Sequence, residues 1–264
     1  MPVPVQAPGH TLGVDLSERR GSSTRHPWEL ARAEFFLRLL ERRRLLEDAG
    51  DWLDAGAGDA WFATQLRERL PAEATITCWD VNYTPEDIQA LRELDAENVT
   101  YVAERPAGRF DRILLLDVIE HVEDDVGFVA GTVRDLLRDD GLVLVSVPAY
   151  QSLWSSHDRT LQHHRRYSPA GCRGLLERAG LAVLANGGLF FSLLPVRIGG
   201  LLIERVRPVR SASEGIGSWS GGRVVTTAIT RVLSADGRFS LALSERGVFA
   251  PGLSYWALCR PSGS

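Results

Sequence analysis

The chain has 264 residues and a formal net charge of −4; 44% of its residues are hydrophobic and 24% are charged. These fractions are typical of globular proteins and exclude collagen-like, disordered and disulfide-stapled chains. The acidic balance gives no overall positive field, so we expect no nucleic-acid partner.

All basic residues are arginine, because the sequence contains no lysine. This excludes a Schiff base to pyridoxal phosphate, a Walker A lysine and a lysine nucleophile. The three cysteines are scattered and never spaced as CxxC, which indicates free thiols. The N-terminal residues lack a signal-peptide pattern, and Pro195 and Arg197 interrupt the longest apolar stretch. We therefore expect a cytoplasmic protein with no membrane span.

In chain order, residues 1–25 show no period and predict a loose arm, whereas residues 27–47 have the apolar spacing of a helix. Short apolar runs and helical segments then alternate. Strands are predicted over residues 51–55, 74–79, 99–103, 113–116, 141–147, 181–185 and 253–259. Helices are predicted over residues 60–70, 85–94 (with Thr84 as N-cap), 125–138 and 168–179. This alternation predicts an α/β fold with a doubly wound, mostly parallel sheet.

The segment between the last two predicted strands is too long for a simple connection. Residues 189–206 are apolar, residues 207–222 are rich in Ser and Gly, and residues 224–243 return to a helical pattern. We predict a helical insertion before the last strand that forms a lid over the site. The chain then divides into an arm and helix (1–48), a cofactor-binding core (49–188), the insertion (189–250) and the final strand (251–264).

Glycines follow the first predicted strand in the string DAGAGD, residues 54–59. Gly56 and Gly58 allow a tight turn and let a ligand approach the backbone where no Cβ intervenes. A polar ligand would then meet free amides at the start of the next helix. The alternative is a strand-to-helix turn that binds no ligand.

An acidic residue, Asp80, ends the second predicted strand, 26 residues after Asp54. An acid at this position can accept hydrogen bonds from both ribose hydroxyls of a nucleoside, although Asp is also an ordinary turn residue. The NAD fingerprint requires a third glycine, but Ala60 and Trp61 stand in that region. The pattern therefore favours a nucleoside cofactor other than NAD.

A third signal, DVIEHVE over residues 117–123, follows the fourth predicted strand. These three signals, in this order, resemble the class I S-adenosylmethionine-dependent methyltransferases over roughly residues 50–185. The resemblance implies a Rossmann-like sheet of seven strands and S-adenosylmethionine as the cofactor. It also implies that the glycine loop holds the methionine part, the acid after strand 2 holds ribose, and the residues after strand 4 line the adenine and methyl-transfer side. The implied cofactor-binding residues are Asp54, Ala55, Gly56, Gly58, Asp80, Val81, Asp117 and Val118, with Glu104 near the place of the acid that follows strand 3.

Two further blocks are similar to a bacterial subgroup of small-molecule methyltransferases. The first is HPWE at residues 26–29, followed by Arg32. The second follows strand 5 and contains WSSHD at residues 154–158, His163 and RRY at residues 165–167, with Gln162 where the subgroup often has glycine. The second block is expected at the carboxyl edge of the sheet, where an acceptor would sit.

The acceptor-side residues offer two kinds of chemistry. A histidine near its ordinary pKa can remove a proton from the acceptor, and the candidates are His26, His121, His157 and His163. Each of these histidines could instead have a structural role. An arginine pair can grip a carboxylate or phosphate or simply brace a loop. The candidate substrate-binding residues are Trp154, Arg165, Arg166 and Tyr167. No metal site is predicted, because the spacing of His157, His163 and His164 fits no standard ligand pattern.

We therefore predict an enzyme that transfers a methyl group from S-adenosylmethionine to a small molecule, either lipophilic or carrying an anionic group. Apolar residues of the insertion would wall the acceptor pocket; they include Leu189, Phe190, Phe191, Leu193, Leu194, Leu201 and Leu202. The insertion could instead pack on the core, form a homodimer interface or contact a membrane surface. The alternatives in function are a peptide or protein methyltransferase and a non-catalytic methyltransferase-like binding partner.

Overall fold

The computed structural model describes residues 25–93, 97–206, 219 and 221–263. Most of the predicted N-terminal arm and most of the Ser/Gly-rich segment lie outside the described residues. No helix in the described part of the chain is both long enough and apolar enough to span a bilayer.

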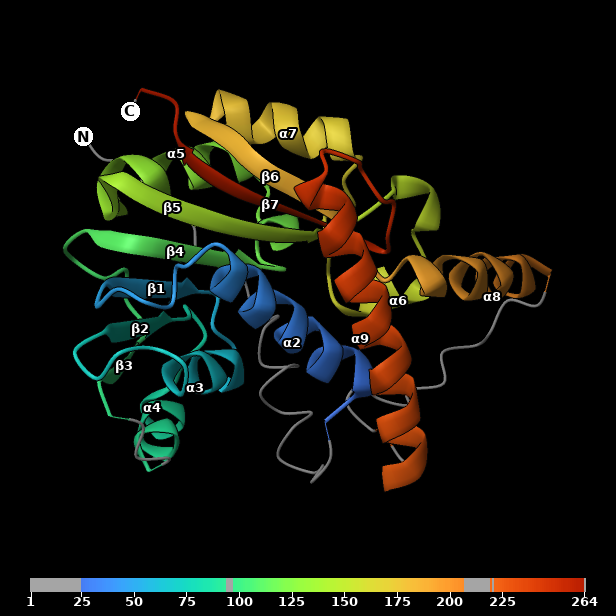
Figure 1. Cartoon of the computed structure of the whole chain (residues 1–264), viewed down its shortest axis with the longest axis horizontal. Coiled ribbons are helices and arrows are strands. Elements are labelled where there is room, and N and C mark those ends of the chain that lie inside the picture. The colour runs from blue at the N-terminus through green and yellow to red at the C-terminus, as the bar shows by residue number, and fades with distance from the viewer. Residues whose placement is uncertain (1–24, 94–96, 207–218, 220, 264) are drawn as a thin grey trace.

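The core is one sheet of seven strands in the order β3-β2-β1-β4-β5-β7-β6 (Figure 1). Its strands are β1 (Asp51–Ala55), β2 (Thr75–Trp79), β3 (Val99–Val102), β4 (Phe110–Leu116), β5 (Leu137–Pro148), β6 (Leu181–Leu189) and β7 (Ser254–Pro261). Neighbours from β3 to β5 pair in parallel, whereas β7 runs antiparallel between β5 and β6. The predicted doubly wound, mostly parallel sheet is confirmed.

Helices cover both faces of the sheet (Figure 1). They are α2 (Pro27–Arg42), α3 (Trp61–Arg67), α4 (Pro85–Arg92), α5 (Asp125–Leu136), α6 (Ser156–Thr160), α7 (Pro169–Arg178), α8 (Leu194–Val206) and α9 (Arg223–Glu245). α2, α3 and α9 pack with one apolar cluster, which contains Trp52, and α5 and α7 pack with a second, which contains Leu53. Adjacent strand residues point to opposite faces, so a strand covered on both sides reads as a continuous apolar run.

Local signals account for where two helices begin. His26 is the N-cap of α2, its Nδ1 accepts a hydrogen bond from the Trp28 amide at 3.3 Å, and Pro27 follows in the first turn. Thr84 caps α4 as predicted, and it forms a reciprocal capping box with Asp87. Satisfied amides at these ends stabilise each helix by about 0.5–2 kcal/mol.

Several predicted boundaries are wrong: α2 ends five residues before residue 47, and β4 begins three residues before residue 113. The predicted helix over residues 125–138 ends at Leu136, because Leu137 turns to extended backbone, is buried and begins β5 opposite Phe110. β6 continues past residue 185 to Leu189, paired with β7. Its glycine residues hid this extension, yet Gly187 allows a close approach, since a Cβ there would lie 3.0 Å from the Trp256 ring nitrogen.

The predicted insertion consists of two different parts. α9 packs along α2 and β6, where Ser234 Oγ lies 2.5 Å from Glu34 Oε2 and Arg42 Nη1 lies 2.8 Å from Glu245 Oε2. α8, by contrast, extends away from the sheet beside α6 (Figure 1). α9 is therefore a helix of the core layer, and α8 is the part that projects.

Candidate active site

Three carboxylates lie where neighbouring parallel strands end. Asp54 is the penultimate residue of β1. Asp80 directly follows β2, and Asp117 directly follows β4. Ligands of doubly wound sheets bind at this carboxyl edge. The structure thus brings the three acids of the sequence motifs to one edge of the sheet.

The loop after β1 is shaped by its glycines. The Gly56 amide donates to the Trp79 carbonyl oxygen at 2.7 Å, and the Gly58 amide donates to Asp80 Oδ2 at 3.0 Å. Gly56 has φ +73°, and a Cβ on it would lie 2.6 Å from Val118 Cγ2. Position 56 therefore excludes a side chain for two reasons, its left-handed backbone and the close approach of Val118.

Asp80 is only 2% exposed, and protein donors fix its carboxylate. Besides the Gly58 amide on Oδ2, the Asn82 amide donates to Oδ1 at 2.9 Å and the Asn82 side chain at 2.8 Å. A carboxylate offers about four acceptor sites, so capacity remains on Oδ2 for a ligand hydroxyl. The turn role and the ribose role of Asp80 are thus compatible.

Asp54 is buried next to a cation. Burial raises the pKa of its carboxyl to about 7, although the nearby Arg32 guanidinium opposes this effect. Arg32, on α2, is ion-paired with Asp117 and lies over the Trp28 ring, 4.9 Å from its centroid. Arg32, with Trp28 beside it, therefore contacts the end of β4 from the side of α2.

The remaining predicted cofactor residues lie around this edge. Ala55 is buried at the end of β1, and Val81 follows Asp80 with 49% of its surface exposed. Val118 lies against the position that a Gly56 Cβ would occupy. Glu104 is exposed two residues beyond the end of β3. The assignment of these residues to a cofactor stays a prediction.

The block after β5 is organised by a residue that sequence reasoning left without a role, Asp158. Its side chain is fully buried and accepts from Arg166 Nε at 2.6 Å, lies 3.0 Å from His163 Nδ1 and accepts from the Ser155 amide at 3.0 Å. Burial favours the neutral carboxyl, but the hydrogen bonds from His163 and Arg166 outweigh burial and hold its pKa well below its usual range. Arg197 of α8 adds a contact at 3.3 Å.

Two other residues of this block tie it to the segment after β4. Arg165 pairs with Asp125 at 2.9 Å, and the Tyr167 hydroxyl donates to Asp125 Oδ2 at 2.8 Å. Trp154 is half-buried. Gln162 has φ +54°, the backbone region that glycine adopts at little cost. The predicted substrate-binding residues Arg165, Arg166 and Tyr167 all have partners within the protein, so a grip on a substrate stays a prediction.

Two of the four candidate histidines lie together, and the other two lie elsewhere. His121 and His163 are together, with ring centroids 4.7 Å apart. His26 caps α2 and lies 4.8 Å from the Trp219 ring. Burial lowers the pKa of His121 and of His157 to about 4, so both are neutral at pH 7. Neutral imidazoles can accept a proton, which keeps both residues as candidate bases.

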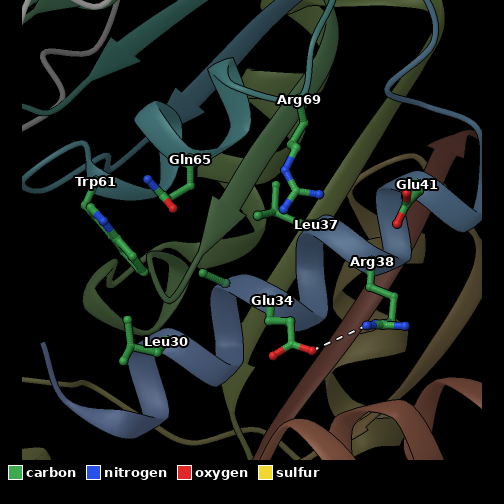
Figure 2. A pocket seen from close by; sticks show the side chains of 9 residues that line it. Leu30, Glu34, Leu37, Arg38, Glu41, Trp61, Gln65 and Arg69 are labelled. Carbon is green, nitrogen blue, oxygen red and sulfur yellow. Dashed lines mark hydrogen bonds and ion pairs between the residues drawn. The ribbon is translucent and has the colours of Figure 1, made fainter. Parts of the chain in front are cut away.

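A surface pocket away from the strand ends is lined by none of the predicted site residues. Figure 2 shows it between α2 and α3, lined by side chains that include Leu30, Leu37, Trp61 and Arg69. Because the acids and histidines of the motifs lie at the strand ends, we locate the candidate site there.

Comparisons with known proteins identify the family of the chain. A family model described as a methyltransferase domain matches residues 28–186, more than half of the chain. No curated protein matches the chain.

Solved structures resemble the fold. A protein described as a sarcosine dimethylglycine methyltransferase from Galdieria sulphuraria is 18% identical, with a TM-score of 0.53, over 88% of this chain and 85% of that chain. The 1,6-didemethyltoxoflavin-N1-methyltransferase of Burkholderia thailandensis, bound to 1,6-didemethyltoxoflavin and S-adenosylhomocysteine, is 21% identical, with a TM-score of 0.50, over 70% and 84%. A chain in the complex of the Haloferax volcanii Trm112 activator with a methyltransferase is 15% identical, with a TM-score of 0.56, over 96% of both chains. The chain therefore belongs to the methyltransferase domain family and is a class I S-adenosylmethionine-dependent methyltransferase.

Proposed function

We propose that this methyltransferase modifies a small-molecule acceptor that binds between the cofactor loops and the block after β5. The observation that carries the proposal is the shared edge: Asp54 and Asp80 lie at the ends of β1 and β2, and His121 and His163 meet beside the end of β4. A methyl donor and an acceptor must lie about 3 Å apart before an in-line displacement. The position of both sets of side chains at one edge of the sheet supports binding of the donor and the acceptor next to each other.

The residues on the β1–β2 side fit the cofactor. Gly56 gives the loop its left-handed turn and lets Val118 approach where a Cβ would clash, and Asp80 keeps acceptor capacity for ribose. Asp54 is a buried acid whose ionised form a cationic ligand would stabilise. S-adenosylmethionine supplies a methyl group on a positively charged sulfonium, and the chain supplies the acids and the glycine loop that would hold it.

On the acceptor side, the chain offers candidate bases. His121 and His157 are neutral at pH 7, and the buried Asp158 orients His163 through Nδ1. Any of the three could take the proton that an oxygen or nitrogen acceptor loses on methylation, whereas His26 is already engaged as a helix cap. The ring nitrogen would take the proton of the acceptor as the acceptor atom bonds to the methyl carbon, and the bond from that carbon to the sulfonium sulfur would break.

We further propose that α8 is the lid over the acceptor. Arg197 of α8 donates to the Leu153 carbonyl oxygen at 3.2 Å and contacts Asp158, which fixes the start of α8 beside the acceptor block. α8 then presents apolar side chains to solvent, such as Val196 and Leu202, which are 69% and 56% exposed. Leu189 and Phe190 are buried in the core, so the expectation that they wall a pocket is wrong. Exposed apolar residues of α8 support a lipophilic acceptor.

The acceptor class is tested with methyl-labelled S-adenosylmethionine and an extract of the source cells, divided by size into metabolites and macromolecules. We expect label in the metabolite fraction, extractable into organic solvent if the acceptor is lipophilic. Protease-sensitive label in the macromolecular fraction would contradict the small-molecule acceptor and favour a peptide or protein acceptor. Binding of cofactor with no label in either fraction would favour the non-catalytic alternative.

A further inference from the structure

A buried carboxyl lies beside the candidate histidines, and no side chain of the described residues forms a hydrogen bond with it. Glu120, in the short 3₁₀ helix η1 (Ile119–His121) after β4, has no exposed surface. Within the described residues, neither of its side-chain oxygens has a hydrogen-bond partner. A buried polar group without a partner destabilises the folded protein, and more so when it is charged, so its presence requires an explanation such as an ion.

Two histidines complete a ligand set around Glu120. His121 follows it in the chain, and the His163 ring meets the His121 ring edge to face at 4.7 Å. One ligand atom from each of the three residues lies within 4.8 Å of the other two. Metal–ligand bonds of about 2.0–2.2 Å would draw the three atoms together by side-chain rotation. Two imidazoles and one carboxylate are a ligand set of divalent transition metals that leaves coordination positions open.

The surroundings orient His163 as metal-binding histidines are oriented. Its Nδ1 lies 3.0 Å from Asp158 Oδ1, so Nδ1 donates to that carboxylate and Nε2 keeps its lone pair. Arg166 fixes Asp158 from the other side. The two ligand-bearing segments are also joined through their backbones, because the His164 amide donates to the Glu120 carbonyl oxygen at 2.8 Å. The site is thus built by a supporting network and does not depend on one loop.

We propose that Glu120, His121 and His163 bind a divalent transition cation of the zinc class. Glu120 is three residues beyond Asp117, in the segment that follows β4 at the carboxyl edge of the sheet. A cation there would bind an oxygen of the acceptor and favour its deprotonated form, and it would replace His121 and His163 as the groups that assist deprotonation. This last step rests on the proposed function, and it narrows the acceptor to molecules with an ionisable hydroxyl or carboxyl group.

The proposal departs from the sequence-based expectation of no metal. The spacing of His157, His163 and His164 fits no ligand pattern, and Glu120 lies in a different segment from all three. The structure shows why spacing was uninformative: the ligands come from two segments about forty residues apart, which β5 and its following block bring together.

The test is zinc binding to the full chain after treatment with EDTA, followed by calorimetric titration with Zn²⁺ and by mass spectrometry of the retained metal. We expect one zinc ion per chain. Glu120→Gln and His121→Asn should each weaken binding at least about tenfold, judging from the loss caused by removing even supporting residues of metal sites. His164→Asn is the matched control, since this neighbouring side chain is exposed, and it should leave the affinity unchanged.

Several results would overturn the proposal. They are no retained zinc in the wild type, an unchanged affinity in both ligand variants with native circular dichroism, or an equal loss in His164→Asn. Cobalt bound in place of zinc gives a second readout, because its visible absorption should change in Glu120→Gln. Binding of S-adenosylhomocysteine is measured in parallel: zinc binding without it would contradict the proposed function alone, and the reverse would contradict the metal site alone.

Discussion

The two halves of the strand-end edge are built in opposite ways. On the β1–β2 side, backbone amides and glycines define the loop, and the Asp54 carboxyl is buried near the Arg32 guanidinium with a raised pKa. On the β4–β5 side, Asp158, Arg166 and His163 satisfy one another in the interior. The difference indicates that the first half is left open to a charged ligand, whereas the second is a rigid frame that positions histidines.

The largest expected effect comes from removing the contacts among Asp158, Arg166 and His163, the rigid frame of the β4–β5 side. Asp158→Ala leaves Arg166, a neighbour that is almost fully buried, without its carboxylate, and we expect the free energy of unfolding to fall by about 3–5 kcal/mol. Urea denaturation measures this change. Glu47→Ala, which breaks an exposed ion pair with Arg44, is the control and should change little. Equal effects in the two variants would show that Asp158 does not organise the block.

Substitutions in the open half, on the β1–β2 side, should change the affinity for the cofactor. Gly56→Ala places an alanine in a left-handed backbone conformation, which costs about 1–2 kcal/mol. It also pushes the alanine Cβ against Val118. We expect cofactor affinity to fall by more than roughly tenfold, which corresponds to 1.4 kcal/mol. Adding Val118→Ala should restore part of the affinity. Gly180→Ala, at φ +84° with open space around it, should affect stability alone, so a similar loss of affinity there would contradict the loop assignment.

The pH dependence of cofactor binding tests Asp54. In the folded protein its pKa of about 7 lies above its ordinary value of 3.8. The neutral form therefore contributes fully to the stability of the folded protein below pH 4, and this contribution is lost as the pH rises through 7. A cationic ligand favours the ionised form. Affinity for the cofactor should therefore rise between pH 6 and pH 8, by up to about tenfold as ionisation becomes complete. Asp54→Asn should flatten this rise, and a rise of unchanged size in the variant would exclude Asp54 as its cause.

The smallest effect is expected at Gln162 in the frame. Gln162→Gly replaces a left-handed residue at φ +54° with glycine and should stabilise the protein by about 0.5–1 kcal/mol. Gln65→Gly, within α3, should destabilise by about 1 kcal/mol. Thermal unfolding measures both changes, and a loss of stability at position 162 would show that the Gln162 side chain has a role of its own.

Much of the open half could be predicted from sequence, because its signals are local. The glycines at 56 and 58, Asp80 after a strand and the Thr84 cap each depend on neighbours close in the chain. The sheet followed from the alternation of apolar runs and helical segments.

The frame could not be predicted in the same way. Asp158 meets Arg197, which is 39 residues away in the insertion, and Glu120 meets His163 across β5. Such pairs leave no periodic signal. The extension of β6 through Gly187 and Gly188 was also hidden, because glycine signals a turn unless packing such as that of Trp256 requires it.

The most direct test of the account is calorimetric titration of S-adenosylhomocysteine into the wild type and Asp80→Ala. The account predicts one binding site in the wild type. It predicts an affinity lower by about 10- to 150-fold in the variant, the size expected for losing a charge-assisted contact of about 1.5–3 kcal/mol. An affinity that is unchanged in a folded Asp80→Ala would contradict the placement of the cofactor at the ends of β1 and β2.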